Sequence, residues 1–167
     1  MDPTDEIRTQ LKQGADSVFK YVERTAETVR EGVKWQTYTH KDEPQYGADL
    51  YNGVAGISLF LSDYHLLTGV ERARDLAFGA LQWCISPGYI VRHDFETAPD
   101  TGLGGGWAGI GLAWLRFFLG TNDSEGLTRA VEIADKLLES EYGPRPDLLW
   151  GTAGTGLFLL RMWEATE

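Results

Sequence analysis

The fold is decided by three stretches of sequence: DLYNGVAGISLFL at residues 49–61, GLGGGWAGIGLAWL at 102–115 and DLLWGTAGTGLFLL at 147–160. All three contain the frame Gly-x-Ala-Gly, at residues 53–56, 106–109 and 151–154. The frames begin 53 and 45 residues apart, and self-similarity at such a period is typical of stacked supersecondary units. The sequence therefore predicts a helical repeat.

Each frame begins a helix that is apolar on nearly all sides, which is typical of a buried helix. In the first two units an amphipathic helix follows. The predicted helices cover about 53–68, 71–84, 107–119 and 125–140, with Gly69 and Gly120 as helix stops, and a third buried helix begins at 151. Loops are expected at 36–52 and 85–105. Each unit thus pairs a buried helix with a surface helix.

Glycine and alanine at the start of the buried helices remove side-chain bulk, so that neighbouring backbones can approach closely. They also leave the amide groups of the first helical turn open to a ligand. Close packing is the simpler explanation of the small residues. The access of a ligand to these amide groups would then be a consequence of the close packing.

The residues before the first frame carry a long helical pattern. Apolar side chains recur at steps of three or four, at Ile7, Leu11, Ala15, Val18, Val22, Ala26, Val29 and Val33. Asp2 is placed to cap this helix, with Pro3 at its first position. We therefore predict one helix up to about Val33. Outside the helices, only Tyr89–Val91 suggests a short extended segment.

Composition and charge exclude several classes of partner. The 167 residues favour a single domain, and 43% hydrophobic with 24% charged residues is ordinary for a soluble protein. The net charge of −10 argues against nucleic acid and against an anionic membrane surface. An acidic surface can attract a basic peptide, although most acidic surfaces serve solubility.

Cys84 is the only cysteine, so an intrachain disulfide is impossible and a cytoplasmic location is the simplest expectation. The start of the chain has no basic region of the kind found in a signal peptide, and no apolar run is long enough to span a membrane.

Segments Leu50–Ile57, Gly106–Leu112 and Leu149–Gly154 resemble the inner helices of the lanthionine synthetase C-like family. The likeness extends over nearly the whole chain. It implies an all-α fold, an α/α-toroid in which inner and outer helices alternate. Residues 1–167 would then form a single domain, a partial barrel of about three helical-hairpin repeats.

The resemblance also implies an activity, the cyclisation of a modified peptide. In the family a cysteine thiol adds to dehydroalanine or dehydrobutyrine and forms a thioether ring. A zinc ion held by two cysteines and one histidine activates the thiol, and a histidine and an aspartate near the metal take part in proton transfer. A peptide substrate is therefore the expected partner.

The sequence departs from the family pattern in two places. A single cysteine on an outer helix cannot replace the Cys-Cys-His set, and Cys84 is expected to be a small core residue. The family often has a histidine just before a mid-chain frame, where this chain has Gly105. We therefore expect no metal ligand and no cofactor in this chain. It is expected to be incomplete alone, either as part of a longer cyclase or as a homodimer of half-rings.

Residues next to the frames are the candidates for chemistry. They are expected at one end of the ring, with Asp49 and Asp147 as catalytic carboxylates and four substrate contacts, Tyr51, Asn52, Trp107 and Trp150. The aspartates can instead cap the helix starts, and the aromatics can be packing lids. His93 is the best general acid or base, because imidazole titrates near neutrality, although a solvated loop histidine is the simpler interpretation.

Two other functions remain open at this point. One is a non-catalytic module that binds peptide or serves as a scaffold. The other is a fragment of a carbohydrate-active α/α-barrel, in which Asp49 and Asp147 act on a glycosidic bond.

Overall fold

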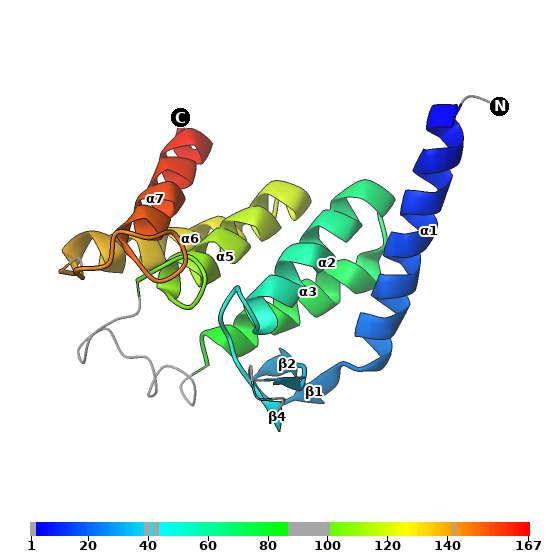
Figure 1. Cartoon of the computed structure of the whole chain (residues 1–167), viewed down its shortest axis with the longest axis horizontal. Coiled ribbons are helices and arrows are strands. Elements are labelled where there is room, and N and C mark those ends of the chain that lie inside the picture. Colours follow the sequence, from blue (N-terminus) through cyan, green and yellow to red (C-terminus); the bar gives the residue numbers. More distant parts are fainter. Residues whose placement is uncertain (1–2, 39–40, 42–43, 87–100, 142) are drawn as a thin grey trace.

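The computed structural model describes residues 3–38, 41, 44–86, 101–141 and 143–167 (Figure 1). The described part is mostly helical. Its helices are α1 Pro3–Arg24, α2 Val54–Thr68, α3 Glu71–Cys84, α5 Trp107–Thr121, α6 Ser124–Glu139 and α7 Thr152–Thr166. Short strands lie between α1 and α2: β1 Glu27–Val29, β2 Gly32–Lys34, β3 Thr37–Tyr38 and β4 Pro44–Gln45. An all-α class is thus confirmed for the repeat units.

The units are arranged as a row of helical hairpins (Figure 1). Helices α2 and α5 pack side by side, α7 packs on α5, and α3 and α6 pack against α2 and α5. Helices α1 and α7 lie at opposite ends of the row. The pairing of inner with outer helices agrees with the sequence, whereas closure into a toroid stays a prediction.

The prediction that the first helix continues to Val33 is wrong. Helix α1 ends at Arg24, and β1 and β2 form an antiparallel hairpin that pairs Thr28 with Val33. Gly32 has a φ of 140°, a conformation that residues with a side chain rarely adopt. The buried Val33 side chain packs against Gly79 of α3. The apolar residue at 33 therefore reflects strand packing and not the face of a helix.

The prediction that Gly120 ends α5 is wrong. The helix continues to Thr121 and ends at Asn122, which has a φ of 56°. A Cβ atom at Gly120 would lie 3.2 Å from the carbonyl oxygen of Ser62 on α2. Glycine at 120 thus serves close contact between two inner helices.

Glycine also lets the next pair of inner helices interlock. The Phe158 ring of α7 is fully buried and lies 2.5 Å from the place that a Cβ atom of Gly111 would occupy on α5. Met162, one turn further along, is buried too, whereas Trp163 is 63% exposed. Close packing between inner helices therefore explains the glycines at 111 and 120.

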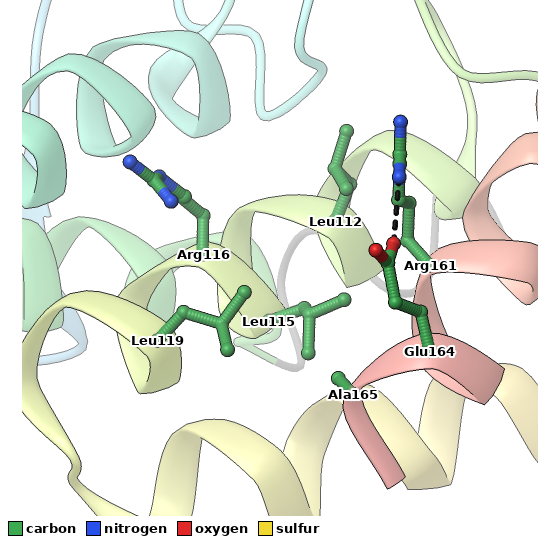
Figure 2. Close-up of a pocket in the computed structure, with 7 residues that line it drawn as sticks. All are labelled: Leu112, Leu115, Arg116, Leu119, Arg161, Glu164 and Ala165. Atoms are coloured by element: carbon green, nitrogen blue, oxygen red, sulfur yellow. Dashed lines mark hydrogen bonds and ion pairs between the residues drawn. The ribbon is translucent and has the colours of Figure 1, made fainter. Parts of the chain in front are cut away.

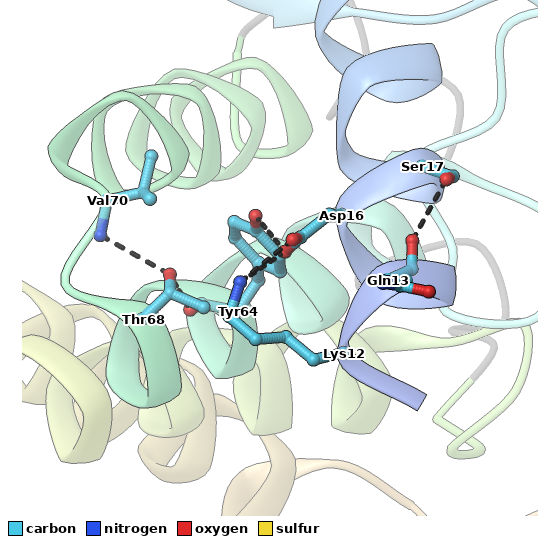
Figure 3. A network of polar contacts seen from close by, with 7 residues as sticks. All are labelled: Lys12, Gln13, Asp16, Ser17, Tyr64, Thr68 and Val70. Carbon is cyan, nitrogen blue, oxygen red and sulfur yellow. Dashed lines mark hydrogen bonds and ion pairs between the residues drawn. The ribbon is translucent and has the colours of Figure 1, made fainter. Parts of the chain in front are cut away.

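Helix α1 is attached to α2 by a stacked contact and by a polar contact, of which Figure 3 shows the polar one. The rings of Phe19 and Tyr64 stack at 4.6 Å, and the Tyr64 hydroxyl donates to Asp16 at 2.8 Å. Lys12 forms an ion pair with the same carboxylate, at 2.8 Å. Ile7, Leu11 and Val18 of the predicted apolar face are exposed, and the buried residue of α1 is Phe19, which the predicted face did not include.

Candidate functional site

The loops that precede the three inner helices are stacked by backbone hydrogen bonds. The amide of Tyr51 donates to the carbonyl of Gly104 at 2.9 Å, and the amide of Gly104 donates to the carbonyl of Leu149 at 2.7 Å. These three residues hold the same position in successive units. The three equivalent loops are therefore in contact at the N-terminal end of the inner helices, and each is followed by its Gly-x-Ala-Gly frame.

Two equivalent carboxylates shape these loops. Asp49 accepts a hydrogen bond from the amide of Asn52 at 2.9 Å, and Asp147 accepts one from the amide of Trp150 at 2.8 Å. Such bonds to the nearby backbone are typical of aspartate in turns. Both carboxylates thus hold turns that lead into inner helices, and a catalytic role for either stays a prediction.

The amide groups at the start of α2 are already bonded within the chain. The amide of Val54 donates to the carbonyl of Gly47 at 2.8 Å, and that of Ala55 donates to Ala48 at 3.2 Å. Val54 and Ala55 are completely buried. The frame at α2 therefore offers no open anion site, and the packing explanation holds there.

An exposed aromatic pair lies across the stacked loops. The rings of Tyr51 and Trp150 meet edge to face, with their centres 6.4 Å apart and their planes at 61°. Tyr51 is 66% exposed and Trp150 41% exposed. The indole lies over Gly105, where a Cβ atom would come within 1.8 Å of it. Trp150 therefore extends from the third unit across the second to the first.

The other two predicted substrate contacts differ in access. Asn52 is exposed, and with its amide nitrogen turned towards the carboxylate it donates to Asp49 at 2.9 Å and accepts from Gln45 at 3.2 Å. Trp107 begins α5 and is only 4% exposed. A bound peptide can therefore touch Asn52, whereas Trp107 supports the loops from within the core.

A groove opens beside Tyr51, with a volume of about 380 Å³. It runs between the second half of α1, β3 and the beginning of α2, and its lining residues are Val18, Val22, Thr37, Leu50, Tyr51, Asn52, Gly53, Gly56, Ile57 and Phe60. A mostly apolar lining with a few polar groups is typical of ligand sites of this size. The wall from α1 could not be predicted, because nothing in the sequence before residue 36 indicates that it meets this end of α2.

A second cavity, of about 440 Å³, lies between α5 and α7 (Figure 2). Ser62 and Gly120 lie close together between α2 and α5. Their equivalents in the next unit, Leu115 and Ala165, line this cavity. Arg161 at its rim bonds Glu164 at 2.6 Å. We assign this cavity no function.

His93 lies outside the described residues, so its role as an acid or base stays a prediction. Among the described helices, none is both long and apolar enough to cross a membrane.

A family model described as lanthionine synthetase C-like protein matches residues 44–167. The chain belongs to the lanthionine synthetase C-like family. The match begins at β4 and includes all three frames, so α1 and the first hairpin precede it. No curated protein sequence matches the chain.

The zinc ion implied by this lanthionine synthetase C-like membership does not fit the described residues. Within that part of the chain, no three histidine, cysteine, aspartate or glutamate side chains gather around a common point. The Cys84 thiol is buried and donates to the carbonyl of Ala48 at 3.5 Å. Burial raises the pKa of Cys84, which disfavours the thiolate that zinc requires. Cys84 is therefore a core residue in this structure.

Proposed function

We propose that this chain provides a peptide-binding end for lanthionine synthetase C-like cyclisation. The substrate is a peptide that contains dehydroalanine or dehydrobutyrine together with cysteine. In the reaction the thiol loses its proton and the cysteine sulfur bonds to the β-carbon of the dehydroamino acid. A proton then adds to the α-carbon, so that the double bond becomes a single bond. The chain's own contribution is to hold the peptide across the stacked loops.

The exposed pair of Tyr51 and Trp150 carries this proposal. Aromatic side chains offer a large contact area with little conformational freedom to lose, which suits recognition of a flexible peptide. The apolar groove beside Tyr51 can receive a side chain of the peptide, and Asn52 can hydrogen-bond its backbone. The family match supports peptide chemistry as the context of this end.

Cyclisation itself is proposed to need residues beyond those described. The buried thiol of Cys84 supports this view, because it offers no metal ligand to the stacked loops. The metal-binding residues would come from another part of a longer chain or from a partner. A purely binding role is the second candidate, and the same observation favours it.

One incubation separates the two candidates. The protein is mixed with a dehydrated peptide that contains cysteine, and both binding and free thiol are followed. Loss of thiol with unchanged peptide mass would indicate cyclisation by this chain alone, whereas binding with all thiol retained would indicate the binding role. Absence of binding would contradict both.

A further inference from the structure

Two equivalent residues lie at the start of the first two stacked loops, and both are buried. Ala48 directly precedes Asp49 in the first loop, and Thr101 holds the same position in the second. A buried carbonyl group that lacks a hydrogen-bond donor is costly. The donors that reach the carbonyls of Ala48 and Thr101 therefore help to decide how firmly each loop is held.

Each of these carbonyls accepts a hydrogen bond from a side chain, but the two donors come from different elements. The Thr155 hydroxyl of α7 donates to the carbonyl of Thr101 at 2.8 Å. The Cys84 thiol of α3 donates to the carbonyl of Ala48 at 3.5 Å. Both donors are buried, so water does not compete for either hydrogen bond.

The repeat shows that the two donors replace each other. Thr155 on an inner helix holds the position of Ile110, and Cys84 on an outer helix holds the position of Leu137. For the first loop, the inner helix is apolar at Ile110 and the outer helix supplies the thiol. For the second loop, the outer helix is apolar at Leu137 and the inner helix supplies the hydroxyl. One side-chain donor is thus kept for each carbonyl, although its place changes.

The neighbouring glycines show that the two sites have the same geometry. A Cβ atom at Gly109 would lie 2.9 Å from the Leu50 side chain, and one at Gly154 would lie 2.5 Å from the amide nitrogen of Leu103. The start of each inner helix therefore packs on the equivalent point of the preceding loop. We expect a thiol at position 137 to reach the second loop in the way that Cys84 reaches the first.

Thr155 acts on the loop that supports an aromatic ring of the peptide site. The carbonyl that it holds is three residues before Gly104, whose amide bonds to the third loop, and the Trp150 indole lies over Gly105. Thr155 is buried and does not itself line the site. Its hydroxyl instead fixes the surface against which the indole packs.

We propose that Thr155 is a positioning residue that fixes the second stacked loop, and that a donor at position 137 can take over its role. The effect on peptide binding rests on the proposed function, whereas the effect on the loop does not. Without the hydroxyl, the second loop shifts more easily, and Trp150 no longer keeps its place beside Tyr51. Peptide affinity should then fall although neither ring has been changed.

Amide hydrogen exchange measured by NMR tests the effect on the loop. Thr155→Val keeps the shape of the side chain without the hydroxyl, so we expect the amides of Leu103 and Gly104 to exchange about fivefold faster. Thr155→Ser keeps the hydroxyl and should restore the parent rates. Ile110→Val, at the equivalent position, is the matched control and should change neither rate. Unchanged exchange in Thr155→Val would overturn the proposal, as would equal acceleration at amides throughout α2, because that would indicate general destabilisation.

A donor swap tests whether the two positions are interchangeable. Adding Leu137→Cys to Thr155→Val reproduces the arrangement of the first loop, so the exchange of Gly104 should return towards the parent rate. Leu137→Cys alone separates the effect of a smaller side chain from that of the new donor. If Thr155→Val exchanges equally fast with and without Leu137→Cys, position 137 does not take over the role and the proposal is contradicted.

Peptide binding tests the consequence for the site. With a labelled peptide that contains dehydroalanine and cysteine, Thr155→Val should bind about fivefold more weakly, and Thr155→Ser should bind like the parent. In a Trp150→Ala background, Thr155→Val should have no further effect, because the ring that it positions is absent. Faster exchange with unchanged peptide affinity would contradict the positioning role. Absence of binding by the parent would contradict the proposed function, whereas the exchange rates would still decide whether Thr155 fixes the loop.

Discussion

The indole ring of Trp150 lies over Gly105 and fills the space that a side chain at residue 105 would need. This contact holds the ring beside Tyr51, at 6.4 Å between ring centres. The absence of a side chain at Gly105 makes room for this ring. The orientation of Trp150 therefore depends on the residue beneath it.

Gly105→Ala should displace the indole, because the new Cβ atom would lie 1.8 Å from the ring. We expect a loss of about 1–3 kcal/mol in the free energy of unfolding, as is usual for overpacking. Urea denaturation followed by circular dichroism measures the loss. Gly143→Ala, with no described atom near its Cβ position, is the control and should change stability little.

The same contact predicts coupling between two substitutions. In a Trp150→Ala background the space above residue 105 is open, so Gly105→Ala should then cost less than 0.5 kcal/mol, roughly the error of additivity for independent sites. Equal costs in the two backgrounds would show that the indole does not rest on residue 105.

Gly111 and Gly156 should respond in opposite directions to alanine. At Gly111 the added Cβ atom would meet the Phe158 ring at 2.5 Å, so we expect destabilisation by about 1–3 kcal/mol. At Gly156 the space is open and alanine is the better helix former, so a gain of about 1 kcal/mol is expected. Urea denaturation followed by circular dichroism compares the two variants. Equal effects would contradict the assigned packing of α5 and α7.

Repetition made much of the fold predictable. The frames at 53–56, 106–109 and 151–154 place the starts of α2, α5 and α7 within one residue of their observed positions. Amphipathic spacing locates α3 and α6 in the same way. The hairpin at Gly32 was missed, because Val29 and Val33 continue the helical spacing while Gly32 supplies a turn. A glycine can end a helix or allow close packing between helices. The sequence alone does not show which of these two roles Gly120 has.

The candidate site was predictable only in part. The repeat implies that Asp49 and Asp147 hold equivalent positions, and both do form equivalent turns. The repeat places Tyr51 and Trp150 at the same end of the inner helices, but it does not indicate that their rings meet. The burial of Trp107 and the α1 wall of the groove likewise depend on tertiary packing.

The contact between Asp16 and Tyr64 should make the attachment of α1 depend on pH. The hydrogen bond from Lys12, followed by that from Tyr64, lowers the pKa of Asp16 below its ordinary value of 3.8. A carboxyl with a lowered pKa in the folded state stabilises the fold above its unfolded pKa, and this contribution is lost as the pH falls through the folded value. Asp16→Asn should therefore be less stable than the parent at pH 7.

That difference should shrink as the pH falls below 3.8, because the parent carboxyl then becomes neutral as well. Urea midpoints of the parent and of Asp16→Asn, measured from pH 7 down to about pH 2.5, test this. Asp5→Asn, at the exposed start of α1, is the control for loss of one negative charge. A difference that stays constant over this range would show that the Asp16 carboxylate does not stabilise α1.

The central claim is that the stacked loops bind a dehydrated peptide through Tyr51 and Trp150. The most direct measurement is fluorescence anisotropy of a labelled peptide that contains dehydroalanine and cysteine, titrated with the parent, with Trp150→Ala and with Leu67→Ala. Leu67 is an exposed apolar residue near the C-terminal end of α2, away from the stacked loops, so Leu67→Ala is the control. We predict saturable binding by the parent and by Leu67→Ala, and at least tenfold weaker binding by Trp150→Ala, about 1.4 kcal/mol. Equal binding by all three proteins, or no binding by the parent at about 1 mM, would contradict the claim.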